Sequence, residues 1–450
     1  MNVSVIGSGY VGLVSAACLA ELGHDVVCVD IDASKVEEIN RGRSPIHEPG
    51  LDDILKKNIG KRMKASCNLN EAVLGSDLSL IAVGTPYRGD RIDLTHIEEV
   101  SRQIGTVLKE KDGYHLVVVK STVVPGTTDG IVLPLLEKTS GKTAGKDFGI
   151  GMNPEFLREG EAVKDFMNPD RIVLGAIDDR SRDALSALYD CFPSTDKILT
   201  TPKTAEMIKY TSNSLLAALI SFSNEIGNLC SAIGDGVDVV EVMKAVHLDK
   251  RLSPILDNGR RVVPAITTYL EAGCGFGGSC FPKDVKALIA YGRDFDQPMG
   301  LMREVIRIND AQPGRVVELL DGIFPSLEGV RVSVLGLAFK PGTDDIRESP
   351  AIAVVKNLLE RKAIVSAYDP VAAGNARKAL EMHDIDYCES LSQAVARADA
   401  VVVMTRWEEF NQLPNLLQSA NPEVVVVDGR RMLDKSTVRR YAGIGLGVGP

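Results

Sequence analysis

The sequence predicts an α/β protein in which two doubly wound domains are joined by a central helical domain. Three observations support this prediction. Short apolar runs alternate with amphipathic runs from the first residue to about residue 200. Helical patterns then take over, and the alternation returns at Val332 in a form that repeats the first stretch. Strands that are apolar throughout are typical of a sheet covered by helices on both faces.

The first stretch contains strand-like runs rich in Val, Ile and Leu. The predicted strands are Val3–Ile6, Asp25–Asp30, Leu78–Val83, Leu116–Lys120, Phe148–Met152 and Ile172–Leu174. Between them lie segments whose apolar residues recur at helical spacing. The predicted helices are Tyr10–Leu22, Lys35–Asn40, Ile97–Leu108 and Thr127–Glu137.

The middle of the chain is predicted to be helical. One long helix, from Thr204 to about Ile233, is apolar on most sides, and such a helix is normally buried or paired with another subunit. Further helical patterns follow at Val237–Val246 and Val285–Tyr291. We therefore predict three domains, at residues 1–200, 201–320 and 321–450.

The last domain repeats features of the first. Val3–Gly7 corresponds to Val332–Gly336, and Asp30 and Asp369 end comparable strands. Four more positions correspond at one constant offset: Leu69, Ala72, Val73 and Asp77 match Leu391, Ala394, Val395 and Asp399. Although short strings of this kind also recur by chance, two related doubly wound domains are the simplest interpretation.

Composition excludes several classes of protein. The 450 residues include 51 Lys and Arg against 61 Asp and Glu, and the net charge of −10 disfavours binding to nucleic acid or anionic lipid. We expect no membrane span, because no apolar run approaches about 20 residues, and no signal peptide, because the N-terminus lacks a basic region. The eight cysteines are too sparse for a disulfide framework and form no CxxC pair for zinc. We predict a cytoplasmic protein without a bound metal.

A glycine-rich motif, Gly7-Ser-Gly9-Tyr-Val-Gly12, follows the first predicted strand and opens the first predicted helix. Its glycines allow a tight turn, close approach of a pyrophosphate and close packing of helix on strand. Asp30 lies 18 residues after Gly12. A carboxylate there accepts hydrogen bonds from the ribose hydroxyls and repels a 2′-phosphate, which favours NAD over NADP. Lys35 weakens this preference, because a nearby cation could accommodate the 2′-phosphate of NADP.

A second glycine-rich segment, Gly275–Asp284, contains Cys280 and Pro282. Because proline suits the first position of a helix, Cys280 is expected just before a helix begins. A thiol at a helix N-terminus has a lowered pKa and is more nucleophilic. Asp284 falls in the first turn, close enough to hold a water or a cation, and the glycines allow a substrate to press against the backbone. We predict that Cys280 is a nucleophile. The other seven cysteines lack this position before a helix.

Two further groups of polar residues are candidates for a ligand site. Glu206, Lys209 and Asn213 share one face of the long predicted helix, where they form either a solvated face or the lining of a cavity. The segment Asn153–Gly160 follows a predicted strand, the place where α/β domains bind ligands, although a plain loop is the alternative.

The loop Gly336–Pro350 follows the first strand of the last domain. It replaces the compact glycine motif of the first domain and carries Lys340 and Arg347. This suggests a phosphate ligand other than a second dinucleotide, whereas surface charge on a loop is the alternative.

Together these segments resemble the UDP-glucose 6-dehydrogenase family, part of the wider UDP-glucose/GDP-mannose dehydrogenase group. The resemblance covers nearly the whole chain. It rests on Gly7–Leu13, Glu48–Leu51, Gly84–Pro86, Lys120–Thr122, Asn153–Gly160, Pro169–Arg171, Ala205–Tyr210, Gly275–Asp284 and Gly336–Pro350. It implies two Rossmann-like outer domains, and a dimer or larger homo-oligomer with the long helix at the subunit contact. It also implies a four-electron oxidation of the sugar C6 alcohol of UDP-glucose to the carboxylate of UDP-glucuronate by two NAD⁺.

The resemblance assigns the covalent chemistry to Cys280. Its thiolate would trap the aldehyde as a thiohemiacetal, and oxidation would give a thioester that water cleaves. Lys209 and Asn213 match residues that stabilise the oxyanion, and the lysine also assists proton transfer in the alcohol step.

The resemblance also names residues for the catalytic water. Asp284 and Thr122 match residues that hold the lysine and this water, and Glu155 matches the carboxylate that activates it. How Lys209, Asp284 and Glu155 divide the proton transfers stays open.

The resemblance further assigns residues to the two ligands. The implied NAD contacts are Gly7, Gly9, Tyr10, Val11, Gly12, Asp30, Lys35, Thr85, Pro86, Thr122, Glu159 and Arg347. The implied UDP-sugar contacts are Glu155, Phe156, Leu157, Lys209, Asn213, Arg251, Tyr269, Phe276, Gly277, Lys340 and, as a weaker candidate, Arg430.

One stretch departs from the family pattern. Asp249-Lys-Arg251 is followed by an extra segment, about Pro254–Thr268, that contains Arg260 and Arg261. In the family an arginine here reaches the sugar site of a neighbouring subunit. Whether Arg251, Arg260 or Arg261 does so, and hence which sugar is used, stays open.

Three other hypotheses remain beside oxidation of UDP-glucose. The same chemistry on a UDP-N-acetylhexosamine or GDP-mannose is the first. A non-catalytic nucleotide-sugar sensor with the same fold is the second, and the candidate residues Cys280, Lys209 and Asp284 argue against it. The third is a two-electron hydroxy-acid dehydrogenase, which would need no cysteine.

Overall fold

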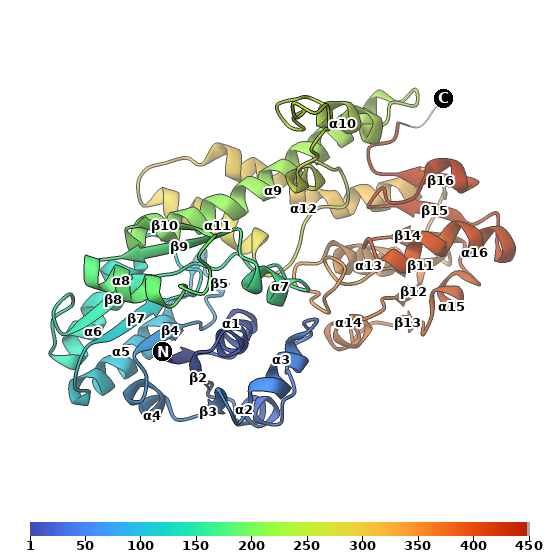
Figure 1. Ribbon diagram of the computed structural model, residues 1–450. Coiled ribbons are helices and arrows are strands. Elements are labelled where there is room, and N and C mark those ends of the chain that lie inside the picture. The colour runs from blue at the N-terminus through green and yellow to red at the C-terminus, as the bar shows by residue number, and fades with distance from the viewer. Residues whose placement is uncertain (448–450) are drawn as a thin grey trace. The chain divides into compact units, whose positions relative to one another are not determined.

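The first of two units, Met1–Ser212, is built around an eight-stranded sheet (Figure 1). The computed structural model describes residues 1–447, so 448–450 of the third predicted domain lie outside the described residues. The strand order is β10-β9-β8-β7-β4-β1-β2-β3. The strands are β1 Asn2–Ile6, β2 Asp25–Val29, β3 Met63–Ser66, β4 Leu78–Ile81, β7 His115–Val119, β8 Phe148–Met152, β9 Arg171–Ala176 and β10 Asp196–Thr200. A separate hairpin pairs β5 Tyr87–Arg88 with β6 Arg91–Ile92.

Helices cover both faces of this sheet, as the apolar strands predict. Along β7, Leu116 and Val118 belong to a core with α1, α3 and α7, whereas Val117 and Val119 belong to a core with α4, α5 and α6. This alternation follows from the two-residue period of a strand. The helices are α1 Tyr10–Glu21, α2 Ala33–Asn40, α3 Leu51–Asn58, α4 Leu69–Leu74, α5 Thr95–Glu110, α6 Leu133–Ser140, α7 Ala162–Met167 and α8 Asp179–Ala187, with a π-helical turn at Thr128–Val132.

The sheet of the first unit is mixed rather than wholly parallel. Strands β1, β2, β3, β4, β7 and β8 run parallel, but β9 pairs with β8 in the antiparallel sense and β10 follows the direction of β9. An antiparallel neighbour needs no crossover to the other end of the sheet. The connection that contains α7 therefore stays at one end of the sheet: β9 begins at the end where β8 finishes.

The second unit, Asn213–Pro450, contains a six-stranded parallel sheet with the order β13-β12-β11-β14-β15-β16. The first five of these strands, β13-β12-β11-β14-β15, reproduce the order β3-β2-β1-β4-β7 of the first unit. The strands are β11 Arg331–Leu335, β12 Ile364–Tyr368, β13 Asp386–Tyr387, β14 Ala400–Val403, β15 Val425–Asp428 and β16 Arg440–Gly443. Two doubly wound domains and a helical segment confirm the predicted fold class.

The repeat extends to side-chain contacts. The Asp77 carboxylate accepts a hydrogen bond from the Asn2 N–H at 2.9 Å, and the Asp399 carboxylate accepts the corresponding bond from the Arg331 N–H at 2.9 Å. In each domain the carboxylate holds the start of the central strand. The correspondence of these aspartates in the sequence therefore reflects one structural role.

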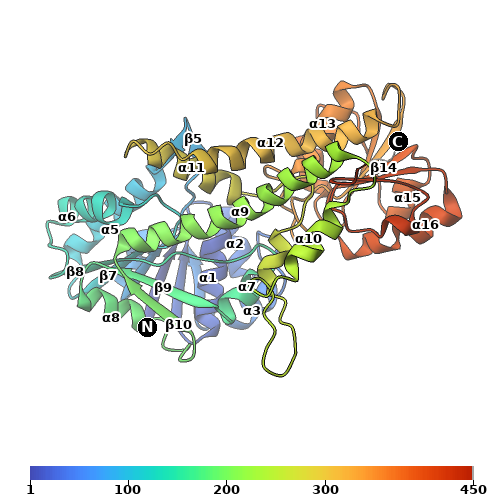
Figure 2. The same cartoon turned by 90° about the horizontal axis from the view of Figure 1, so that it is seen from above.

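Helix α9, Pro202–Ile233, crosses the boundary between the units and is the long helix that the sequence predicts. In the second unit it runs beside α12, where Ser221 donates to the Val305 carbonyl and Asn228 to Gln312, both at 2.9 Å (Figure 2). The other helices are α10 Val239–His247, α11 Phe281–Arg293, α12 Gly300–Asp321, α13 Pro350–Glu360, α14 Ala373–Ala379, α15 Leu391–Val395 and α16 Leu413–Ala420. Helix α12, which contains an internal proline, Pro313, was not predicted from the sequence.

Helix α9 corrects one expectation from composition. Among the described residues it is the one helix that is long and apolar enough to cross a membrane. Several of its polar side chains have partners within the protein, for example Asn224, whose side-chain oxygen accepts from the Gly273 N–H at 2.7 Å. Length and composition alone therefore do not make α9 a membrane span.

Candidate active site

The glycine motif lies where β1 passes into α1, as predicted. A side chain at Gly12 would come within 1.9 Å of the Gly7 carbonyl oxygen, and one at Gly7 would come within 2.7 Å of the Ala82 oxygen. These two glycines are therefore required by close packing. Gly9, the residue before α1, has open space where a side chain would stand. An open backbone at a helix N-terminus fits the pyrophosphate of a dinucleotide.

Asp30 lies directly after β2 and is joined to the glycine motif. Its carboxylate accepts from the Ser8 N–H at 2.8 Å, from the Ser8 hydroxyl and from the Asp32 N–H at 3.0 Å. Burial by itself would raise the pKa of Asp30, but these hydrogen bonds and the charge of Lys35 outweigh it, so the pKa lies below its ordinary value. The carboxylate is thus ionised at neutral pH and suited to the ribose hydroxyls of NAD.

Replacing Asp30 with alanine is expected to raise the KM for NAD⁺ about tenfold or more, because a charge-assisted hydrogen bond contributes about 1.5–3 kcal/mol. Initial rates over a range of NAD⁺ concentrations measure the effect. Asp25→Ala, at the opposite end of β2, is the matched control and should keep the KM of the unchanged chain. An unaltered KM in the Asp30 variant would show that the ribose role is wrong.

Other predicted NAD contacts lie at the same edge of the first sheet. The Thr85 hydroxyl donates to the Thr122 carbonyl at 2.7 Å, so these residues join the loops after β4 and β7. The Tyr10 hydroxyl donates to the Glu48 carboxylate, which also accepts from the N–H groups of Gly160 and Ala162, both at 2.7 Å. Glu48 holds the start of α7, a role that spacing along the chain could not reveal.

Glu155 and Lys209 form a buried ion pair in the first unit. The Lys209 ammonium lies 2.8 Å from the Glu155 carboxylate, and their side chains are 3% and 5% exposed. The other carboxylate oxygen accepts from the Leu157 N–H at 2.6 Å. Burial alone would raise the pKa of Glu155, but Lys209, the Leu157 N–H and the charge of Lys120 hold it below its ordinary value. The pair is a candidate for proton transfer.

The three residues of the polar stripe on α9 have different partners. Glu206 accepts from the N–H groups of Gly126 and Thr128 and from the Thr128 hydroxyl, so it holds the start of a helical turn. Lys209 pairs with Glu155, and Asn213 bonds to Asp284 within the second unit. All three are buried, which excludes the interpretation as a solvated face.

Cys280 is the residue that precedes α11, Phe281–Arg293, as Pro282 predicts. It is partly exposed, whereas Cys18, Cys28, Cys230, Cys274 and Cys388 are buried. Burial raises the pKa of Cys18 and of Cys28 to about 12, so these thiols are poor nucleophiles. Cys280 combines partial exposure with a helix N-terminus.

Asp284 lies one turn into α11 and is 1% exposed. One of its oxygens accepts from the Asn213 amide at 2.6 Å, and the other accepts from the Lys283 ammonium at 2.6 Å. The sequence predicts a water or a cation at Asp284, and the cation found beside it is Lys283, which was not predicted. Among residues 1–447, no group of His, Cys, Asp or Glu side chains is arranged to hold a metal ion.

The glycines before Cys280 have a packing role. A side chain at Gly277 would come within 2.3 Å of the Glu348 carbonyl, and one at Gly278 within 2.8 Å of the Phe339 ring. The loop between β11 and α13 fills the space beside these glycines. On the other side of the segment, the rings of Phe276 and Tyr269 lie 5.9 Å and 6.3 Å from that of Phe281.

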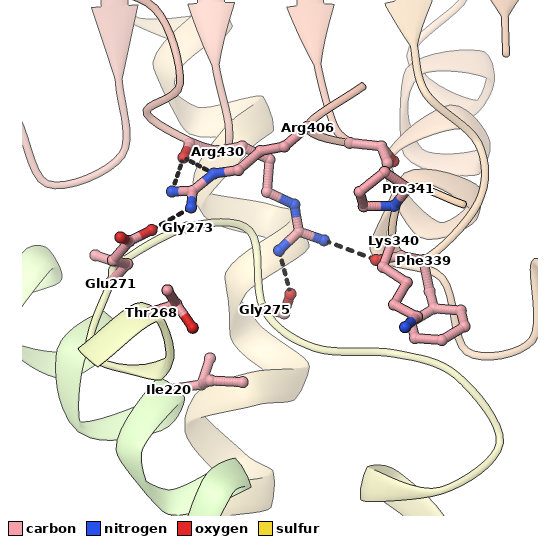
Figure 3. Close-up of a pocket in the computed structure, with 12 residues that line it drawn as sticks. Ile220, Thr268, Glu271, Gly273, Gly275, Phe339, Lys340, Pro341, Arg406 and Arg430 are labelled. Atoms are coloured by element: carbon pink, nitrogen blue, oxygen red, sulfur yellow. Dashed lines mark hydrogen bonds and ion pairs between the residues drawn. The ribbon is translucent and has the colours of Figure 1, made fainter. Parts of the chain in front are cut away.

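The second unit contains a pocket of ≈ 140 Å³ next to this segment (Figure 3). Its lining includes Lys340 and Arg430, two predicted UDP-sugar contacts. Arg430 donates to the carbonyl oxygens of Met404, Gly275 and Phe339 at 2.7–3.2 Å, so it ties the pocket walls together. Arg406, which the sequence analysis missed, pairs with Glu271 and donates to the Arg430 carbonyl.

The remaining predicted residues are distributed between the units. Val11, Lys35, Pro86, Phe156, Leu157 and Glu159 lie in the first unit. The guanidinium of Arg171, a residue without a predicted role, lies 4.0 Å from the centre of the Phe156 ring. In the second unit, Arg347 makes a two-pronged contact with Asp345 at 2.7–3.0 Å.

The extra segment after Arg251 folds as a hairpin. Ile255 and Arg261 form an antiparallel bridge, and the Leu256 N–H donates to the Arg260 carbonyl at 2.9 Å. Arg251 pairs with Asp249 at 2.5 Å, and the Arg261 guanidinium donates to the carbonyls of Leu248 and Ser253. Arg261 therefore stabilises the hairpin. That one of these arginines reaches the sugar site of another subunit stays a prediction.

Comparisons with known proteins cover all parts of the chain. Models of the UDP-glucose/GDP-mannose dehydrogenase family match in order: the NAD binding domain at residues 1–193, the central domain at 203–311 and the UDP binding domain at 333–435. The chain is 45% identical to a UDP-glucose 6-dehydrogenase of Haloferax volcanii, over 97% of this chain and 98% of that protein. It is 39% identical to a GDP-mannose 6-dehydrogenase of Pseudomonas putida, over 99% and 100%.

A solved structure shows the same arrangement of elements. The structure of a UDP-glucose dehydrogenase from the archaeon Pyrobaculum islandicum matches with a TM-score of 0.88 and 40% identity, over 98% of this chain and 97% of that one. The open Gly9 backbone and the ionised Asp30 fit the cofactor named by the first domain model. The chain therefore belongs to the UDP-glucose/GDP-mannose dehydrogenase family and is an NAD-dependent oxidoreductase that acts on a nucleotide sugar.

Proposed function

We propose that this protein oxidises the C6 alcohol of UDP-glucose to a carboxylate and so forms UDP-glucuronate. The observation that carries the proposal is the partly exposed Cys280 thiol at the start of α11. The name of the Haloferax volcanii relative supports the choice of UDP-glucose. In this function residues 1–200 form an NAD-binding domain, 201–320 a central domain and 321–450 a UDP-sugar domain.

Cys280 supplies the covalent step. After the alcohol has become an aldehyde, the thiolate adds to the carbonyl carbon, and the oxygen takes a proton to give a thiohemiacetal. Loss of a hydride and the hydroxyl proton leaves a thioester. Water then adds to the thioester carbon and expels the thiolate, and the product is a carboxylate. Two hydrides leave the sugar in all, which makes this a four-electron oxidation.

NAD binds at the glycine motif of the first unit, and each bound NAD⁺ supplies the acceptor for one hydride. Gly9 offers the open backbone for its pyrophosphate, and Asp30 accepts from its ribose hydroxyls. Tyr10, Thr85, Thr122 and Glu159 complete this set in the proposal.

Lys209 and Glu155 carry the proton transfers in the first unit. Their buried contact lets a proton pass from the ammonium to the carboxylate, and the amine then takes the proton of the C6 hydroxyl and regains its positive charge. The Asn213 amide, oriented by Asp284, donates to the oxyanion in the proposal, and Lys209 adds positive charge. We assign the acid–base chemistry to Lys209 and Glu155 because they contact each other directly, whereas Asp284 is bonded to Lys283.

The pocket of the second unit takes the UDP portion of the substrate. Lys340 and Arg406 bring positive charge to it, as a diphosphate requires. Arg430 acts on the ligand through the pocket walls that it holds, because its N–H groups already donate to three carbonyls.

A second substrate class is the alternative. The identity of 39% to a GDP-mannose 6-dehydrogenase favours the same chemistry on GDP-mannose, and a UDP-N-acetylhexosamine would need no new chemical step. The hairpin after Arg251 is the part of the chain that we expect to distinguish these sugars.

Self-association is part of the proposal. Leu215, Phe222, Leu229 and Ile233 of α9 are 50–56% exposed and recur at intervals of seven and four residues, so they form one apolar stripe. A second copy of the chain would cover this stripe in a homodimer. We expect the enzyme to act in the cytoplasm, where NAD⁺ and nucleotide sugars occur.

A panel of nucleotide sugars tests the proposal. With NAD⁺, UDP-glucose is expected to give the highest kcat/KM, and NADP⁺ to be a poor replacement. Complete conversion should release two NADH per sugar, which absorbance and product analysis measure together. One NADH per sugar would overturn the four-electron assignment, and a preference for GDP-mannose would select the alternative.

A further inference from the structure

A second buried lysine lies beside the Glu155–Lys209 pair. Lys120 directly follows β7 and is 4% exposed. Its ammonium donates to the side-chain oxygen of Asn153 at 2.8 Å and lies 5.9 Å from the centre of the Phe166 ring. Because removing an ammonium from water is costly, a buried lysine whose hydrogen-bond partner is a neutral amide calls for an explanation. The proposed reaction gives Lys120 no task.

Asn153 connects Lys120 to the neighbouring strands. Its backbone N–H donates to the Val119 carbonyl on β7, and its side-chain amide donates to the Val173 carbonyl on β9, both at 2.9 Å. Its side-chain oxygen accepts from Lys120 and also from the Tyr189 hydroxyl. The hydrogen bonds therefore fix the position where the chain leaves β8, two residues before Glu155.

Charge provides a second link between Lys120 and Glu155. Two charged groups act on Lys120: Glu155, from the loop after β8, and Lys209, from α9. The Tyr189 hydroxyl donates to the same Asn153 oxygen as Lys120. Burial lowers the pKa of Lys120 to about 8, with an opposing effect from Glu155 and a further lowering by Lys209. At neutral pH two ammonium groups therefore act on one buried carboxylate.

We propose that Lys120 is a positioning residue of the active site: through Asn153 it fixes the segment that carries Glu155, and its charge acts on that carboxylate in addition to the charge of Lys209. The inference rests on the proposed function, because it concerns the same proton-transfer pair. It adds a residue that touches neither the substrate nor the cofactor in the proposed reaction.

Three variants test this inference in the full-length enzyme. Lys120→Met keeps most of the side-chain length and removes the charge, whereas Lys120→Arg keeps the charge. Lys111→Met is the control, because that lysine also donates within the first unit, to the Val73 and Leu74 carbonyls, but at a different place. The measurements are kcat and KM for UDP-glucose and NAD⁺ from pH 3.5 to pH 9, with thermal unfolding as a check on folding.

Lys120→Met is expected to lower kcat about tenfold or more at pH 7, while both KM values change less than about threefold. The acidic limb of the kcat profile should move to higher pH, because Glu155 loses one of the charges that lower its pKa. Lys120→Arg should recover part of the kcat and most of the original pH profile. Lys111→Met should behave as the unchanged enzyme.

Other results would overturn the inference. An unchanged kcat and pH profile in Lys120→Met would mean that Lys120 positions nothing. A loss of activity that follows only the loss of thermal stability, with the acidic limb unmoved, would show a structural role instead. The same shift in Lys111→Met would show that the effect is not specific to Lys120.

A measurement without turnover separates this inference from the proposed function. The ¹³C chemical shift of the Glu155 carboxyl, assigned with Glu155→Gln, should titrate at higher pH in Lys120→Met than in the unchanged protein. If the enzyme oxidises no nucleotide sugar but this titration moves, the proposed function fails while the link from Lys120 to Glu155 stands. If the enzyme is active and the titration does not move, the inference fails alone.

Discussion

Replacing Cys280 with serine is expected to lower the rate of UDP-glucuronate formation by about 10³-fold or more, because a hydroxyl at this position is a far weaker nucleophile than a thiolate. The first oxidation does not need the thiol, so the ratio of NADH to sugar should fall from two toward one. The remaining product should be the aldehyde, or a sugar joined as an ester to the introduced hydroxyl, and intact-protein mass spectrometry distinguishes these two outcomes.

The control for this experiment is Cys191→Ser, which changes an exposed cysteine outside the candidate site. It should keep the full rate and the ratio of two. Unchanged turnover in the Cys280 variant would eliminate the covalent route and would favour a two-electron dehydrogenase. Binding of NAD⁺ and UDP, measured by calorimetry, should be retained in both variants and shows that the fold is intact.

Replacing Lys209 with methionine is expected to reduce both activity and stability. The change leaves the Glu155 carboxylate buried without the ammonium that lies 2.8 Å away. Removal of one partner from a buried ion pair costs about 3–5 kcal/mol in the free energy of unfolding. Loss of the positive charge at the reacting oxygen should lower kcat by about 10²–10³-fold. Steady-state kinetics and urea unfolding at pH 7 measure the two effects.

The loss of stability in the Lys209 variant should depend on pH. In the unchanged protein the pKa of Glu155 is held below its ordinary value. The ionised carboxylate therefore stabilises the fold fully at pH values above the ordinary pKa, and this stabilisation is lost as the pH falls through the lowered pKa. Without Lys209, burial dominates and raises the pKa. The carboxyl then stabilises the fold at low pH and loses this effect as pH rises through the raised value.

The difference in unfolding free energy between the two proteins should therefore be largest at pH 7 and should shrink toward pH 4. Lys203→Met on the same helix is the control. Lys203 is exposed and lies 3.7 Å from Asp129, and such a surface pair contributes about 0–1 kcal/mol. A pH-independent loss in the Lys209 variant would mean that the pair with Glu155 is not its cause.

Much of the fold could be predicted because its signals are local in the chain. The apolar strands, the glycine motif and Pro282 before α11 each depend on neighbouring residues. The repeat was visible for the same reason, since Asp77 and Asp399 stand at corresponding places before their strands. Weak elements such as the two-residue strand β13 and the proline-containing α12 lacked these signals and were missed.

By itself, then, the sequence determined the class of fold, the location of the glycine motifs and the position of Cys280 at a helix start. The tertiary structure decided which polar side chains meet. Glu155 meets Lys209 from a distant part of the chain, Lys120 meets Asn153, and Glu48 meets Tyr10. These contacts depend on the order and direction of strands, including the reversal at β9. A buried charge is stable only when these long-range contacts place a partner beside it, and spacing along the chain does not contain that information.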